Sequence, residues 1–195
     1  MPEPGGGTRE VRRETRDENL VIRGRRVEND PWRTLGGDAG EDLSTLPPGP
    51  IIVPLKLFNQ RYEELQRRDH PYGVWLGPDD DPADLASRIS RLASPPNLVA
   101  VYFPKFGDGR GYSTGALLRT RYGWQGELRA FGDIGRDHLF NLARCGFDAF
   151  RLPPQRDPHD AIAGFSDFSL RYQGSVDDPV PLFRKRSAHA AGGTR

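Results

Sequence analysis

The sequence NLVAVYFPKFGDGRGYS, residues 97–113, joins an unbroken apolar run to a glycine-rich loop. The apolar run is typical of a strand that is covered on both faces, as in the middle of a parallel sheet. The loop after it places charged side chains between glycines at positions 107, 109 and 111. This stretch therefore predicts a central strand with a polar loop at its carboxyl end.

On both sides of this strand, short apolar runs alternate with segments of helical periodicity, which is the signature of βα units. Four more strands are expected, at residues 51–55, 72–78, 126–132 and 147–152. We therefore predict an α/β fold, a single domain with about five mainly parallel strands flanked by helices. Because the order of the strands cannot be read from the sequence, a partial βα barrel is the alternative to an open sheet.

Capping signals indicate where the helices between these strands begin and end. Asp81 is followed by proline, a pair that predicts an N-cap and the first helical position. After the central strand, a helix is expected from about Thr114 to Tyr122, with Gly123 as its left-handed C-terminal glycine. Asp133 is expected to cap the next helix.

The composition changes near both ends of the chain. Residues 1–19 and 185–195 are polar and are predicted to be disordered tails. Residues 20–184 are predicted to form the α/β domain, in which a hairpin and a proline-stiffened linker (20–50) precede the βα core (51–184). A domain of this length can bury a single core.

Charge and composition argue against several classes of protein. The 195 residues carry 28 Lys and Arg against 27 Asp and Glu, a net charge of +1, so nucleic acid is not expected as a partner. No apolar stretch approaches the ~20 residues that span a bilayer, and no apolar segment follows the charged N-terminus. We therefore expect a cytoplasmic protein without a membrane segment. The single cysteine, Cys145, excludes a cysteine-held iron–sulfur cluster within one chain.

The loop after the central strand is the strongest candidate site, because ligands of parallel sheets bind at the carboxyl ends of the strands. Its glycines can expose backbone N–H groups, and its cations can hold a phosphate, sulfate, sulfite or carboxylate. Two acids, Asp108 and Asp133, are the candidate catalytic residues, which would orient these groups or shuttle protons. The predicted anion-binding residues are Lys105, Gly107, Gly109, Arg110, Gly111, Tyr112, Ser113 and Arg136.

The same loop has a simpler structural interpretation. Asp108 and Arg110 can pair with each other, with the glycines only turning the chain. A dinucleotide fingerprint is not expected, because its spacing requires glycine where Tyr112 or Thr114 stands. A small anion is therefore the ligand that the loop favours.

No metal site is predicted. One of the three aspartates at residues 79–81 is needed as a helix cap, and the other two are most simply solvated. His138 has no second histidine or acid at metal-binding spacing, so we interpret it as a surface or packing residue.

Several segments resemble, in order and spacing, a bacterial family of unknown function. They lie between about Val53 and Arg184 and read VWLGPDDDPADLA, FPKFGDGRGYS, RYGWQGELRAFGD, DHLF, RCGFDAF, YQGSVD and PLFR. Members of that family are usually described as probable oxidoreductases of sulfite reduction, encoded beside assimilatory sulfite reductase. The resemblance supplies no catalytic residues, so the candidate site rests on this sequence alone.

The resemblance implies a role in cysteine biosynthesis through sulfate assimilation. Sulfite reduction ordinarily uses sirohaem coupled to a four-iron cluster, which a chain with one cysteine cannot hold alone. We therefore predict an accessory protein of assimilatory sulfite reduction, with a small anionic ligand and with sulfite reductase or another sulfate-assimilation enzyme as its partner. The alternative is a small oxidoreductase, or another enzyme acting on a sulfur-pathway anion, with a borrowed nicotinamide or flavin cofactor.

Overall fold

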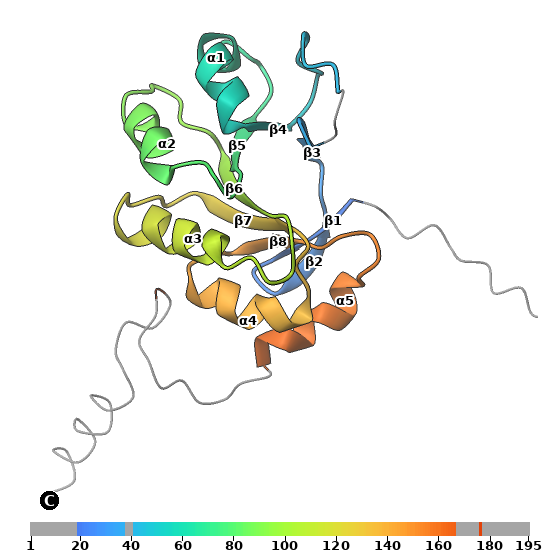
Figure 1. The fold of residues 1–195 in the computed structure, drawn as a ribbon. Coiled ribbons are helices and arrows are strands. Elements are labelled where there is room, and N and C mark those ends of the chain that lie inside the picture. Colours follow the sequence, from blue (N-terminus) through green and yellow to red (C-terminus); the bar gives the residue numbers. More distant parts are fainter. Residues whose placement is uncertain (1–18, 38–40, 167–175, 177–195) are drawn as a thin grey trace, which may run out of the picture.

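The computed structural model describes residues 19–37, 41–166 and 176, which form one mixed sheet with helices (Figure 1). The predicted tails lie outside the described residues, apart from Asn19. The predicted βα series is present. Its elements are β4 Ile51–Pro54, α1 Leu55–Gln66, β5 Tyr72–Leu76, α2 Pro82–Ile89, β6 Leu98–Phe103, α3 Arg110–Thr120, β7 Glu127–Gly132, α4 Arg136–Arg144, β8 Ala149–Arg151, α5 Pro158–Ala161 and the 3-10 helix η1 Ile162–Ser166.

Within the described residues, the sheet has eight strands in the order β2-β1-β8-β7-β6-β5-β4-β3, not about five. Strands β3 to β8 are parallel to one another. The predicted hairpin, β1 (Leu20–Arg23) and β2 (Arg26–Asn29), joins the sheet antiparallel to β8. The short strand β3 (Arg33–Thr34) extends the opposite edge. The expected number of strands was too low, because the prediction placed the segment before residue 51 outside the sheet.

The sheet is curled into a half-barrel, the alternative that the sequence left open. The chain passes from β2, at one edge, to β3, at the other edge, through residues 30–32 alone, which we call the bridge. Laid flat at ~4.8 Å per strand, eight strands would separate these edges by about 34 Å, whereas the bridge reaches at most about 14 Å. The edges must therefore approach each other. Accordingly, Nη1 of Arg151 on β8 donates to Oγ1 of Thr34 on β3 over 3.1 Å.

The helices between the parallel strands cover one face of the half-barrel, and the main core lies between them and the sheet (Figure 1). Every crossover steps to the next strand in the same direction, so right-handed connections place these helices on a single face. Along β6, Val99, Val101 and Phe103 enter this core. The alternate residues Leu98 and Ala100 belong to a smaller cluster on the concave face.

A buried charge network fastens the bridge to the concave face. The guanidinium of Arg129 on β7 contacts Asp30 of the bridge over 2.8 Å, and both side chains are 1% exposed. Arg129 also contacts Glu127 over 2.7 Å, and Glu127 in turn pairs with Arg23 of β1 over 2.8 Å. Opposite charges thus satisfy one another inside the half-barrel, in line with the rule that buried charges are paired.

The caps of α2 and α3 explain where these helices begin. Asp81 caps α2 as predicted, and its carboxylate accepts the N–H of Ala83 over 2.8 Å. Helix α3 begins at Arg110 rather than near Thr114. The reason is that Asp108 accepts the backbone N–H of Arg110 over 3.1 Å and so organises the chain one turn earlier.

Helix α4 begins at Arg136 with Gly135 as its N-cap, so the prediction that Asp133 caps this helix was wrong. The backbone N–H of Gly135 donates instead to Nδ1 of His138 over 3.1 Å. A side chain from within the helix therefore replaces the expected cap. Asp133 lies two residues before the cap, and its carboxylate contacts residues that follow the neighbouring strands β6 and β8.

Candidate functional site

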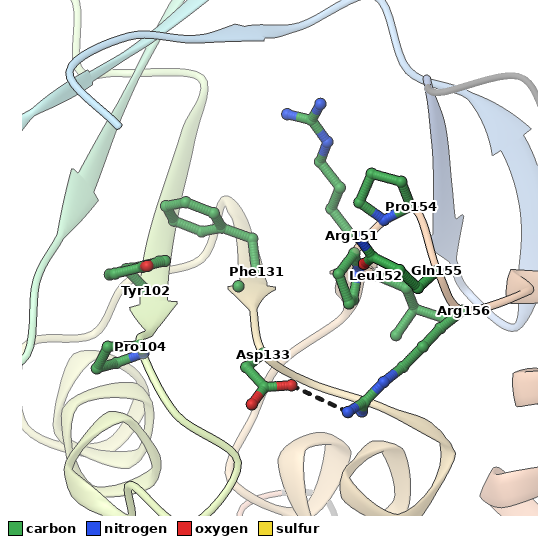
Figure 2. Close-up of a pocket in the computed structure, with 11 residues that line it drawn as sticks. Tyr102, Pro104, Phe131, Asp133, Arg151, Leu152, Pro154, Gln155 and Arg156 are labelled. Atoms are coloured by element: carbon green, nitrogen blue, oxygen red, sulfur yellow. Dashed lines mark hydrogen bonds and ion pairs between the residues drawn. The ribbon is translucent and has the colours of Figure 1, made fainter. Parts of the chain in front are cut away.

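A pocket of about 520 Å³ opens at the carboxyl ends of β6, β7 and β8 (Figure 2). Tyr102, Phe131 and Arg151 occupy one row of the sheet, because they are register partners on these three neighbouring strands. In Figure 2, the two aromatic rings lie on one side of the pocket and the segment 152–154 lies on the other. The pocket is thus where parallel sheets bind their ligands.

Arg151 lines this pocket as a cation that has no acidic partner among the residues that the structure describes. Its side chain is half-buried, and its guanidinium makes one hydrogen bond, to the neutral hydroxyl of Thr34. No carboxylate among the described residues forms an ion pair with it. A guanidinium has five N–H donors, so several of those on Arg151 remain available to a ligand. An unpaired, half-buried cation in a pocket favours an anionic ligand.

Asp133 lines the same pocket, and each of its carboxylate oxygens contacts a neighbour. Its Oδ1 accepts from Nη2 of Arg156 over 2.9 Å, and its Oδ2 accepts the backbone N–H of Phe106 over 2.9 Å. Gly135 makes room for this arrangement, because a Cβ there would collide with the guanidinium of Arg156. Asp133 therefore positions Arg156 and the loop after β6.

Phe106 is held at both of its backbone polar groups. Asp133 accepts its N–H, and Nε2 of His138 lies 3.0 Å from its carbonyl oxygen. Because Nδ1 of His138 already accepts from Gly135, Nε2 carries the proton and donates to Phe106. The Phe106 ring stacks edge-on against His138 at 4.2 Å and also lies under the guanidinium of Arg156. His138 is buried, so it has the packing role expected from the sequence.

The charged side chains of the glycine loop do not line this pocket. Arg110 pairs with Asp108 over 2.7 Å and with Asp79, from the loop after β5, over 2.6 Å. The hydrogen bonds from Arg110 lower the pKa of Asp108. The pairing of Asp108 with Arg110, which the sequence offered as the simpler interpretation, is therefore present. Arg110 and Asp133 both lie beyond the carboxyl ends of the parallel strands, but of the two only Asp133 lines the pocket.

The glycines of the loop do not adopt left-handed backbone. Among the described residues, positive φ values occur at other glycines and at Arg25, but not at Gly107, Gly109 or Gly111. Gly107 and Gly109 have open space around them. Gly111 instead allows close packing of α3, because a Cβ there would collide with the ring of Phe103. The anion-binding role of these glycines stays a prediction.

The other predicted site residues lie apart from the pocket. Lys105 is exposed in the loop, and Ser113 is exposed within α3 rather than at its start. Tyr112 packs edge-on against Phe103 on the helix-covered face, where burial raises its pKa to about 12. Arg136 is exposed at the first position of α4, and its backbone packs against Gly164. Their roles in binding are likewise untested predictions.

Sequence reasoning missed Arg151, the last residue of β8, and Arg156, in the segment that follows it. The signal was available, because both stand at the carboxyl end of a predicted strand, the position that marked Lys105 and Asp133 as candidates. What distinguishes Arg151 is its hydrogen bond to Thr34, which joins β8 to a residue far away in the chain. That contact depends on the curl of the sheet, which the sequence pattern leaves open.

In the part of the chain that the structure describes, no group of three or more His, Cys, Asp or Glu side chains is arranged to hold a metal ion. Nor do the described helices include one that is long and apolar enough to cross a bilayer.

Comparison with known proteins identifies a family. A search of curated proteins finds no match to the sequence. Residues 73–183, more than half of the chain, match the family described as "Bacterial protein of unknown function (DUF934)". The matched region runs from the second residue of β5 to beyond β8, and it includes the residues that line the pocket. On this match, the chain belongs to the bacterial DUF934 family.

Proposed function

We propose that the protein is an anion-binding accessory protein of assimilatory sulfite reduction, and that its anion binds in the pocket at the ends of β6, β7 and β8. The proposed binding site rests on one observation. Arg151 is a half-buried cation that lines the pocket and has no acidic partner among the described residues. The pathway comes from the family resemblance given in the sequence analysis.

Binding fits this pocket better than catalysis. Asp133 is the one carboxylate among the residues that line it, and both of its oxygens already accept hydrogen bonds. If Asp133 acted as a general base, it would have to do so while its oxygens hold Arg156 and the Phe106 loop in place. The pocket therefore offers a ligand the charge of Arg151 and apolar walls, whereas its one carboxylate already makes two contacts.

Sulfite titration by calorimetry tests the anion site. A charge-assisted hydrogen bond is worth about 1.5–3 kcal/mol, so Arg151→Gln should weaken sulfite binding roughly 10- to 150-fold. Arg110→Gln is the matched control, because Arg110 lies on the same edge of the sheet outside the pocket. Loss of binding in Arg110→Gln with full binding in Arg151→Gln would move the site to the glycine loop and overturn the assignment.

The accessory role needs its own measurement. Purified sulfite reductase mixed with this protein should give a complex in size-exclusion chromatography, and the protein by itself should not turn over sulfite. Absence of a complex together with no effect on the rate of the reductase would overturn the role. Turnover by the isolated protein on addition of NADPH or reduced flavin would favour the oxidoreductase alternative instead.

A further inference from the structure

The pocket has the shape of a slot. Tyr102 and Phe131 stand side by side on neighbouring strands, with ring centroids 5.2 Å apart and planes at 41°. Across the pocket in Figure 2 stand Leu152 and Pro154, which belong to the segment that leaves β8. A flat ligand between these walls would contact aromatic rings on one side and aliphatic side chains on the other.

The aromatic wall is held in place before any ligand arrives. The indole of Trp75 packs edge-on against Tyr102 at 6.0 Å and against Phe131 at 5.9 Å. Its Nε1 donates to the carbonyl oxygen of Leu35 over 2.8 Å, which fixes the indole itself. The opposite wall contains two consecutive prolines, whose backbone is restricted. A preformed slot of this kind loses little conformational entropy on binding.

The volume of the pocket exceeds what a bare oxyanion needs. At about 520 Å³ it falls within the range of sites for small organic molecules. An ion of four heavy atoms displaces only about two waters, or ~60 Å³ at ~30 Å³ per water. Sulfite or phosphate alone would contact Arg151 and leave the aromatic wall uncovered.

Charge and shape together point to one class of ligand. We propose that the pocket binds a planar heterocycle that carries a phosphate, the chemistry of a mononucleotide, with its ring in the slot and its phosphate on Arg151. This inference rests on the proposed anion site and names the ligand of that site. Stacking of a base on aromatic side chains supplies affinity without base-specific hydrogen bonds, and the guanidinium supplies a forked donor for phosphate.

Binding of four probes to the full chain tests the proposal. AMP and FMN have both ring and phosphate, adenosine has the ring alone, and inorganic phosphate has the charge alone. We expect AMP or FMN to bind at least tenfold more tightly than either partial probe in calorimetry. Arg151→Gln should reduce AMP binding to the level of adenosine, whereas Arg67→Gln, at an exposed side chain that does not line the pocket, should leave it unchanged.

The variant Phe131→Leu tests the slot. It should weaken AMP binding about tenfold, in the range found for loss of one stacked aromatic side chain. Binding of inorganic phosphate should be unchanged. Tyr102→Leu is a second variant in case Phe131→Leu does not fold, as judged by circular dichroism. The inference is overturned if AMP and FMN bind no more tightly than inorganic phosphate. If sulfite then still binds in an Arg151-dependent manner, the anion site stands without the ring; if no anion depends on Arg151, the proposed site fails as well.

Discussion

Replacement of Arg129 by methionine tests whether the bridge is fastened to the sheet by charge. The Arg129 side chain is 1% exposed and contacts Asp30, equally buried, at 2.8 Å and Glu127 at 2.7 Å. Arg129→Met leaves the Asp30 carboxylate buried without its cation, and removal of one partner of a buried pair costs about 3–5 kcal/mol. Because methionine is flexible and apolar, it can fill much of the vacated space, so most of this loss should be electrostatic.

A double-mutant cycle separates the pair from its surroundings. Asp30→Asn should also be destabilising, because it leaves Arg129 with Glu127 alone. In the double variant neither charge is buried unpaired, so its loss should be about 2 kcal/mol smaller than the sum of the two single losses. Urea titration measures each free energy of unfolding, with circular dichroism and tryptophan fluorescence as signals. Trp32 lies in the bridge and contributes to that fluorescence.

Arg33→Met is the matched control for this cycle. Arg33 directly follows the bridge and pairs with Glu41 over 3.4 Å, but its side chain is 65% exposed. A surface pair of this kind should contribute less than about 1 kcal/mol. If Arg129→Met costs no more than Arg33→Met, or if the two changes of the cycle are simply additive, the bridge is not held by the buried pair and the reasoning fails.

Two further predictions concern stability. Gly132→Ala should lower the free energy of unfolding by about 2–4 kcal/mol, because φ is 103° there and a Cβ would meet the carbonyl oxygen of Phe103. Gly107→Ala should change it by less than about 0.5 kcal/mol, and equal losses in urea titration would contradict this contrast. Burial raises the pKa of Tyr72 to about 12, so between pH 10 and 12 the folded chain keeps a proton that the unfolded chain releases. Stability should therefore fall over that range, by about 2 kcal/mol at most from this residue. Tyr72→Phe should remove that part of the decline, and an unchanged pH profile would refute it.

The βα series could be predicted because its signals are local. The apolar run before Pro104, the Asp81 cap and the positive φ of Gly123 and Gly146 all depend on residues near one another in the chain. The hairpin of β1 and β2 was predicted, but its pairing with β8 was not, and the two-residue strand β3 was missed, because both are recognised only by the strand they pair with. The curl of the sheet follows from those pairings, so it too was left as an alternative.

The candidate site was predicted in part. The rule that ligands bind at strand ends led to Asp133, which lines the pocket, and to the glycine loop, which touches that pocket residue through the backbone of Phe106. Glycines among charges resemble an anion-binding loop, yet Gly111 serves helix packing and Arg110 is held by two carboxylates. Sequence spacing cannot distinguish a glycine that exposes backbone from one that admits a neighbouring ring.

The pocket of this chain depends on more than the strands that match the family. The matched region begins at residue 73, whereas Thr34 and Leu35, which hold Arg151 and Trp75, precede it. Both lie within three residues of the end of the bridge, so the segment that begins where the chain has crossed the open side of the half-barrel orients the cation and supports the aromatic wall. The parallel strands supply the positions of the side chains that line the pocket. The contact that orients Arg151, on which the proposed anion site depends, comes from the short edge strand β3 that the curl brings opposite β8.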